Sequence, residues 1–181
     1  IGHAHNEITK VINQQSKKLI HVSNLFNIKN QQALANKLCK ISGMNSAFFC
    51  NSGSEANETA LKLARLHANN KKLKNPKIII FDKSWHGRTI ATLSATGNKS
   101  VQAGFKPLIS GFVKCQLNDM KAVKKVINNN NVSAVILETI QGEGGIRIAE
   151  DKFLKEIRKI TLQKDIRHTS VEQVRSELEE H

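Results

Sequence analysis

The chain has 181 residues, of which 39% are hydrophobic, and a formal net charge of +13. This length suffices for one packed domain, and no apolar run approaches the roughly 20 residues of a membrane-spanning helix. The excess of basic residues would suit a nucleic acid, but the lysines are spread along the whole chain and no nucleic-acid motif is present. We therefore expect neither a membrane nor a nucleic acid as a partner.

The sequence contains three widely separated cysteines, Cys39, Cys50 and Cys115. Their spacing matches neither a disulfide framework nor a metal site, and two of them lie in apolar segments. We expect buried free thiols in a reducing compartment, hence a cytoplasmic protein. His3 and His5 have no further ligands nearby in sequence, so we expect no metal. The chain opens with Ile1 rather than Met, and we expect its natural start to lie upstream.

Helical and strand patterns alternate along the chain. In chain order they predict helices at 7–20 and 31–41, a strand at 47–50, a helix at 54–69, strands at 77–81 and 111–114, a helix at 119–128, a strand at 133–137 and a helix at 151–160. Several of these strands are continuous apolar runs, which is typical of strands buried on both faces of a parallel sheet. The sequence therefore predicts an α/β fold with a mostly parallel sheet flanked by helices.

Polar, glycine-containing segments follow three of the predicted strands, at residues 51–55, 82–88 and 138–145. In parallel α/β folds, ligands bind at the carboxyl ends of the strands. The three segments should therefore meet at one edge of the sheet and form a single site.

The first segment has the features of an anion site. Ser52 and Glu55 form a capping-box pattern, which predicts that a helix begins at this turn. The free N–H groups of a helix N-terminus attract phosphate, and Gly53 would let a phosphate approach closely. An ordinary well-capped helix with no ligand is the alternative interpretation.

The other two segments supply an aromatic ring and charged side chains. Trp85, the only tryptophan, could stack on a flat heterocycle, and Arg88 offers a planar fork of donors for a carboxylate. The alternative is a core tryptophan beside a solvated arginine. Glu138 and Glu143 follow the last buried strand, where carboxylates could hold a cation, orient a histidine or pair with an arginine.

Five ordered blocks carry a family resemblance: FFCNSGSEANE at 48–58, WHGRT at 85–89, LSATG at 93–97, GFKPL at 104–108 and ETIQGEGG at 138–145. With these blocks, residues 1–159 resemble part of the class III (ornithine-type) aminotransferases, which use pyridoxal phosphate, and among them the acetylornithine aminotransferases most closely. The resemblance implies a partial cofactor-binding large domain of fold type I. Full-length relatives are homodimers that act on amino-acid and 2-oxo-acid substrates.

The resemblance also implies roles for the cofactor-binding residues. Ser52, Gly53 and Ser54 occupy the turn that binds the cofactor phosphate. Trp85 stands where relatives usually carry the Phe or Tyr that stacks on the pyridine ring. Glu138 lies near the cofactor as a supporting residue.

Two residues are implied in substrate binding. Arg88 matches the arginine that holds the substrate α-carboxylate, and Glu143 matches the carboxylate that pairs with a switch arginine. His86 favours N-acetylornithine over ornithine as the amino donor, although the 4-aminobutyrate enzymes share this histidine. The implied reaction is amino transfer from N-acetylornithine to 2-oxoglutarate in arginine biosynthesis, with ornithine, succinylornithine or 4-aminobutyrate as alternative donors.

Two parts of the family's machinery are missing from this chain. The Schiff-base lysine and the acid that faces the pyridine nitrogen lie downstream in relatives, and residues 160–181 show no resemblance to those segments. We predict a divergent tail there, with Ser170 and Gln173 as caps of a short helix. Asp165 lies near the expected place of the acid, but its polar neighbours do not match. We expect the chain alone to be inactive; a non-catalytic domain that binds pyridoxal phosphate or a partner is an alternative, and a basic nucleic-acid binder is a third.

Overall fold

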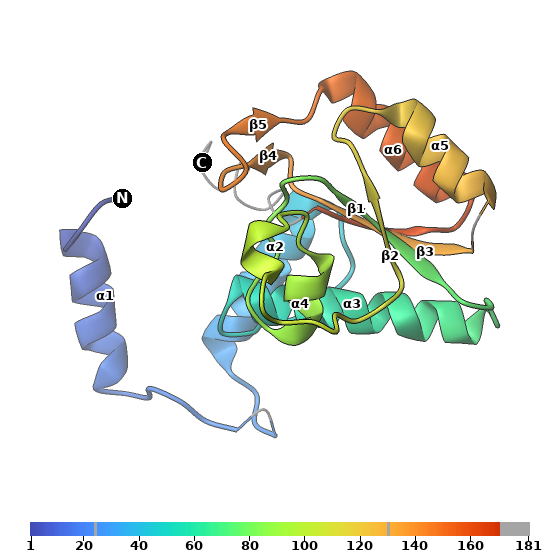
Figure 1. Cartoon of the computed structure of the whole chain (residues 1–181). Coiled ribbons are helices and arrows are strands. Elements are labelled where there is room, and N and C mark those ends of the chain that lie inside the picture. The colour runs from blue at the N-terminus through green and yellow to red at the C-terminus, as the bar shows by residue number, and fades with distance from the viewer. Residues whose placement is uncertain (24, 130, 171–181) are drawn as a thin grey trace. The chain divides into compact units, whose positions relative to one another are not determined.

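The structure is a computed structural model that describes residues 1–23, 25–129 and 131–170 (Figure 1). The chain divides into two compact units, Ile1–Phe48 and Phe49–His181. Within the described residues, no helix is long and apolar enough to cross a bilayer.

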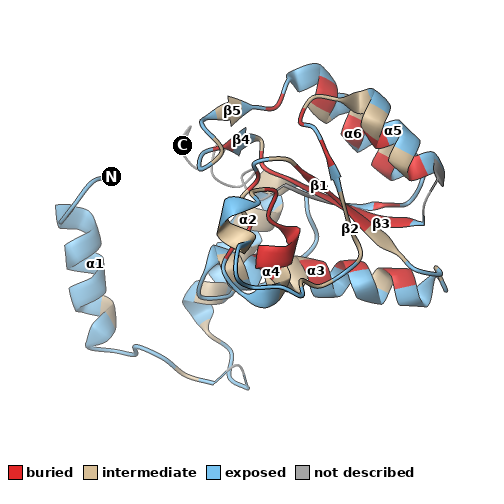
Figure 2. Ribbon diagram, viewed as in Figure 1, coloured by how far each residue is buried: buried red, intermediate tan, exposed pale blue. Residues whose placement is uncertain are grey.

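The first unit consists of two amphipathic helices, α1 (Asn6–Ser16) and α2 (Lys29–Ser42). Both helices were predicted from apolar periodicity, and α1 ends earlier than expected. Gly43 terminates α2 in the left-handed region, at φ +67°, as expected for a glycine after a helix. Neither helix contains a buried residue, as the absence of red on them in Figure 2 shows. Their apolar side chains therefore have no core of their own.

The second unit is built on a parallel sheet with strand order β2-β1-β3-β6. The strands are β1 (Lys77–Phe81), β2 (Phe112–Cys115), β3 (Val132–Leu137) and β6 (Arg167–Ser170). All three pairings, β1 with β2, β1 with β3, and β3 with β6, are parallel. Every residue of β3 is buried, which agrees with its continuous apolar sequence. The predicted α/β fold with a mostly parallel sheet is confirmed.

Helices cover both faces of this sheet (Figure 1). On one side lie α3 (Gly53–Asn70) and α4 (Ile90–Ala95), and on the other lie α5 (Met120–Asn129) and α6 (Asp151–Gln163). Successive side chains of a strand point to opposite faces of the sheet, so β1 and β3 contribute residues to two separate cores. The core beneath α3 and α4 contains Leu61, Ala64, Ile78, Ile80, Ala95, Ala134 and Ile136. The core beneath α5 and α6 includes Ile79, Phe81, Val123, Ile127, Val135, Leu137, Phe153 and Ile157.

Two short strands, β4 (Ile140–Gln141) and β5 (Arg147–Ile148), form an antiparallel hairpin after β3. Neither strand was predicted, because two residues carry no detectable period. The helix α4 was also missed; it begins after Thr89, whose hydroxyl accepts the N–H of Thr92.

One predicted strand is wrong. Residues 47–50 form no strand, and the Phe48 side chain is 72% exposed. An apolar run becomes a strand only beside a hydrogen-bonded neighbour, and the described sheet offers none to this segment. As a consequence Cys50 is exposed rather than buried, whereas Cys115 is buried as expected.

The tail differs in part from its prediction. Residues 160–170 contain the end of α6 and the strand β6, so this portion is not wholly helical. The helix expected to follow Ser170 lies outside the described residues.

Candidate active site

The site begins at the N-terminus of α3. The Ser52 hydroxyl accepts the Glu55 N–H at 3.2 Å, and the Glu55 carboxylate accepts the Asn51 N–H at 2.6 Å. These two bonds fix the turn and start the helix at Gly53, as the capping-box pattern predicted. Because its hydroxyl serves as the cap, Ser52 contributes to the site through the backbone that it shapes.

Two backbone N–H groups remain available at this helix end. The described residues supply no acceptor to the N–H groups of Gly53 and Ser54, which lie in the first turn of α3. A Cβ atom built on Gly53 would meet nothing within 4 Å, so the approach to these donors is open. The donors and the positive end of the helix dipole together favour an anion such as phosphate.

The loop after β1 places an aromatic ring and a guanidinium beside these donors. The Trp85 side chain is half-buried, and the Arg88 guanidinium carbon lies 5.7 Å from the centre of its ring. Arg88 is exposed and forms no ion pair within the described part of the chain. This cation–π contact orients the arginine while leaving its N–H fork free for a carboxylate.

Gly87 brings this loop into contact with α3. Its φ of +134° lies where side chains are strained, and a Cβ at this position would collide with the hydroxyls of Ser54 and Thr92. Only glycine allows the loop to lie this close to the helix N-terminus.

Between Trp85 and Gly87 lies a buried histidine. The His86 side chain is 2% exposed, and neither of its ring nitrogens has a hydrogen-bond partner among the described residues. Burial lowers the pKa of the imidazole from 6.5 to about 4. His86 is therefore neutral at physiological pH.

Two carboxylates approach from the segment after β3. Glu138 is buried, and its Oε2 accepts the Trp85 N–H at 2.9 Å. Glu143 lies in the turn of the β4–β5 hairpin; its side chain is exposed and forms no ion pair among the described residues. The first carboxylate therefore holds the tryptophan loop, and the second is open to a ligand or partner group.

The β4–β5 hairpin is fastened to the end of β1. Arg147 Nη1 lies 3.0 Å from Asp82 Oδ2 and 3.2 Å from Gln141 Oε1, while Gln141 Nε2 donates to the Asp82 carbonyl at 2.9 Å. At Gly144 a Cβ would lie 2.6 Å from the Lys83 carbonyl oxygen, so only glycine permits this close approach. These contacts fix the hairpin that carries Glu143.

These segments enclose a cavity of about 740 Å³. It is lined by Gly53, Ser54, Asn57, Trp85, His86, Gly87, Arg88, Thr89, Glu138 and Glu143. Of the residues proposed from the sequence for cofactor and substrate, all line this cavity except Ser52. The donor set suits a ligand with a phosphate at α3, a flat ring at Trp85 and a carboxylate near Arg88.

Sequence reasoning missed Asn57 as a member of the site. The Asn57 side chain is 5% exposed, and its Nδ2 donates to the His86 carbonyl at 2.8 Å. The available signal was its position: Asn57 shares a helical face with Leu61 and Ala64, where a polar residue needs a partner.

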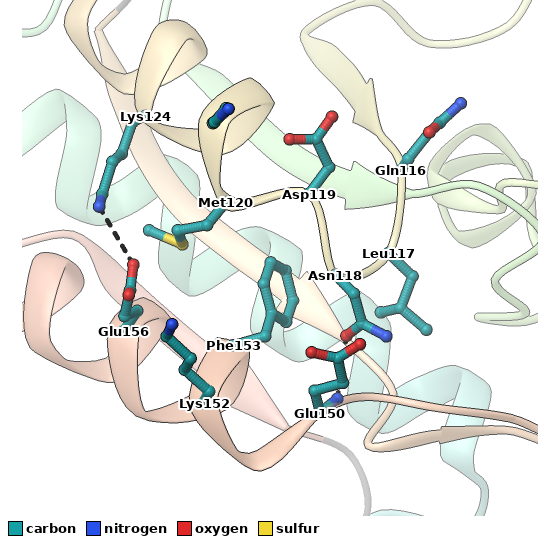
Figure 3. A pocket seen from close by; sticks show the side chains of 11 residues that line it. Gln116, Leu117, Asn118, Asp119, Met120, Lys124, Glu150, Lys152, Phe153 and Glu156 are labelled. Carbon is teal, nitrogen blue, oxygen red and sulfur yellow. Dashed lines mark hydrogen bonds and ion pairs between the residues drawn. The ribbon is translucent and has the colours of Figure 1, made fainter.

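A second cavity, of about 680 Å³, lies between the N-terminal ends of α5 and α6 (Figure 3). Phe153 and Met120 form part of its wall, and the Lys124–Glu156 ion pair, at 3.1 Å, crosses it. Its lining carries charges of both signs. It shares no lining residue with the first cavity.

Asp165 lies far from the candidate site along the sheet. It occupies the turn before β6, at the amino end of that strand, whereas the site lies at the carboxyl ends of β1 and β3. Its carboxylate pairs with Lys71, near the end of α3, and this contact lowers its pKa. This position agrees with the sequence analysis, which gave Asp165 no role in the site.

Comparisons with known proteins place this arrangement in a family. The aminotransferase class-III family model matches residues 1–167. An acetylornithine aminotransferase from Nitrosomonas europaea is 48% identical over 161 residues, which cover 88% of this chain and 41% of that enzyme. An acetylornithine aminotransferase from Bordetella parapertussis is 44% identical over 161 residues, which again cover 88% of this chain and 41% of that enzyme.

Solved structures give the same result. The N-acetylornithine aminotransferase of Stenotrophomonas maltophilia superimposes with a TM-score of 0.77 at 32% identity, and the ornithine aminotransferase of Toxoplasma gondii with a TM-score of 0.87 at 26% identity. Each match covers 93% of this chain and 41% of the other, so the chain spans less than half the length of these relatives. Because the family model covers most of its residues, the chain belongs to the class III aminotransferases, a family of pyridoxal phosphate-dependent transaminases.

Proposed function

We propose that this chain carries the cofactor-phosphate and substrate-carboxylate portion of an acetylornithine aminotransferase site. The observation that carries the proposal is the cavity in which the α3 N-terminus, the sole tryptophan and Arg88 meet. The 48% identity to an acetylornithine aminotransferase supports N-acetylornithine as the amino donor of the whole enzyme. We propose 2-oxoglutarate as the amino acceptor and arginine biosynthesis as the pathway, as the resemblance implies.

Pyridoxal phosphate would supply the electron sink of the reaction, and the chain's own residues would bind and orient it. The N–H groups of Gly53 and Ser54, in the turn capped by Ser52, would hold the phosphate. The half-buried face of Trp85 would lie against the ring, and Glu138 would keep that tryptophan in place through its backbone.

The exposed charges of the cavity would select the substrate. The Arg88 fork matches a carboxylate in two-pronged geometry, and its contact with Trp85 restricts its orientation. Glu143, exposed on the hairpin, would pair with a switch arginine, as the resemblance implies.

We further propose that the chain alone binds the cofactor without catalysing amino transfer. Strand β6, whose sequence is Arg167-His168-Thr169-Ser170, contains no acid that could face a pyridine nitrogen. No lysine of the chain stands in the sequence context of the family's cofactor lysine. This favours a non-catalytic cofactor-binding domain over a self-sufficient enzyme for these 181 residues.

The test is a titration of the purified chain with pyridoxamine 5'-phosphate, followed by quenching of Trp85 fluorescence. This form of the cofactor cannot condense with lysines, so the many surface lysines do not interfere. We expect saturable quenching that is at least about tenfold weaker with pyridoxamine, because the phosphate contributes charge-assisted hydrogen bonds. Equal quenching by the two compounds, or none, would refute the proposed cofactor site.

The absence of catalysis is tested separately with N-acetylornithine and 2-oxoglutarate in the presence of pyridoxal phosphate. We expect no formation of glutamate above the protein-free rate. Turnover, together with borohydride reduction that fixes the cofactor to one lysine, would show that the chain is a complete catalyst.

A further inference from the structure

The segment Trp85–His86 is held by three side chains from three different elements. Glu138, after β3, accepts the Trp85 N–H at 2.9 Å, and Thr96, after α4, accepts the His86 N–H at 3.2 Å. Asn57, in α3, donates to the His86 carbonyl at 2.8 Å. All three of these side chains are buried.

Asn57 is costly for the fold to place. Asparagine is a poor residue for a helix interior, and a buried primary amide loses its bonds to water. Asn57 nevertheless lies on the buried face of α3, in line with Leu61 and Ala64. Its bond to His86 compensates for this burial in a way that no apolar residue could reproduce.

The position of Asn57 gives the bond a geometric effect. Asn57 lies one helical turn after Gly53 and Ser54, whose N–H groups form the anion site. His86, whose carbonyl accepts this bond, lies between Trp85 and Gly87 in sequence, and Gly87 packs closely against the Ser54 side chain. The bond therefore ties the helix end that would hold a phosphate to the loop that carries the aromatic ring.

We propose that Asn57 is a positioning residue that sets the spacing between the α3 N-terminus and the Trp85 loop, so that one ligand can engage both. Such a ligand combines a phosphate with a flat heterocycle. A phosphate or a heterocycle alone would contact only one of the two protein segments and would not depend on the distance between them. The identity of the ligand rests on the proposed function, whereas the tie between α3 and the loop does not.

The first test uses the ligand-free chain. Asn57→Asp keeps the shape of the side chain and replaces the amide donor with a carboxyl group, and Asn57→Leu removes all polarity at similar volume. We expect backbone hydrogen exchange at Trp85 and His86 to accelerate about tenfold or more relative to β1 and β3, because the His86 carbonyl loses its partner. Exchange at wild-type rates in both variants would overturn the proposal.

The second test compares two probes, pyridoxamine 5'-phosphate and inorganic phosphate. If Asn57 sets the spacing, its replacement weakens binding of the two-part ligand about tenfold and leaves the affinity for inorganic phosphate nearly unchanged. A residue that served stability alone would weaken both probes together or neither. Equal changes in the two affinities would therefore also overturn the proposal.

Thr161→Val is the matched control. Thr161 is equally buried, and its hydroxyl donates to a backbone carbonyl in α6, on the other side of the sheet. We expect this variant to lower the melting temperature without changing exchange at Trp85 or the affinity for either probe. If both Asn57 variants fail to fold while Thr161→Val folds, Asn57 is a folding determinant and the proposal is wrong.

The outcomes also separate this proposal from the proposed function. A wild-type chain that binds inorganic phosphate but not pyridoxamine 5'-phosphate would refute the cofactor site. The exchange measurement on the ligand-free variants would still decide whether Asn57 fixes the loop.

Discussion

His86 is a neutral histidine whose burial makes folding sensitive to pH. Its pKa is about 4 in the folded chain, against the ordinary 6.5. Above pH 6.5 the folded and unfolded states are both neutral at this residue. As the pH falls below 6.5, the unfolded chain takes up a proton that the folded chain refuses until about pH 4, so stability declines across that interval.

We expect His86→Leu to remove this part of the pH dependence. Neither ring nitrogen has a partner among the described residues, so the replacement should change stability by no more than about 1 kcal/mol at pH 8. By pH 5 the wild type should have lost about 2 kcal/mol relative to the variant. Urea unfolding of both proteins from pH 8 to pH 5 gives the difference between their unfolding free energies at each pH. The contributions of other titrating groups cancel in this difference. Parallel stability curves would contradict the assignment of a depressed pKa.

The residues of the site were partly predictable. Local pattern made Gly53, Trp85 and Arg88 candidates, since a capped helix start, a lone aromatic and a planar cation each have a known chemistry. The family resemblance then implied their roles and that of Ser54. The bond from Asn57 to His86 was not predictable, because it joins residues far apart in sequence whose relation depends on how α3 packs on the sheet. The sequence pattern identifies candidate side chains, and tertiary packing decides to which backbone atoms they form hydrogen bonds.

At the scale of elements, the β4–β5 hairpin depends on contacts with the end of β1. The Arg147 guanidinium bridges Asp82 and Gln141, and the hairpin itself has only two residues in each strand. A hairpin of this size is not stable by itself in water. Its position, and with it that of Glu143, therefore depends in part on this bridge.

We expect Arg147→Met to loosen the hairpin with little global effect. The ion pair is about one-third exposed, so its loss should cost no more than about 1 kcal/mol of unfolding free energy. Hydrogen exchange in peptides covering residues 140–148 should accelerate severalfold, while β1 and β3 stay protected. Lys124→Met is the control, since it removes an ion pair between α5 and α6 and should leave the hairpin unchanged. An unaltered exchange rate at 140–148 in Arg147→Met would show that other contacts hold the hairpin.

Elements with a long repeat were predicted well, and elements that depend on a neighbour were not. The apolar periodicity of α3 and α6 and the apolar runs of β1 and β3 located those elements to within a few residues. Strand β6 is polar in sequence and forms a strand because β3 offers it an edge. Residues 47–50 show the reverse, an apolar run without a strand to pair with.

At the scale of the whole molecule, the two units differ in how much they bury. The core residues lie in Phe49–His181, whereas α1 and α2 contain no buried residue, and Val11 and Ile12 are more than half exposed. Since apolar burial is the main source of stability, the first unit should open far more readily than the second.

Limited proteolysis with trypsin tests this difference. We expect the first cuts at the lysines of residues 10–40 and a product that retains the α/β unit, identified by its intact mass. The comparison is internal, because α5 and α6 are equally rich in lysine but are anchored by Val123 and Ile157 in the core. Initial cleavage within α5 or α6 would contradict the assignment of stability to the second unit.

The alternation of β1 and β3 between two cores has a consequence for how this sequence can evolve. Ile78 and Ile80 belong to the layer of α3 and α4, which carries the candidate site, while Ile79 and Phe81 belong to the layer of α5 and α6. Neighbouring residues of one strand thus pack into different layers. Substitutions can therefore accumulate beneath α5 and α6 and retune stability, while the interleaved positions continue to hold the geometry of the site.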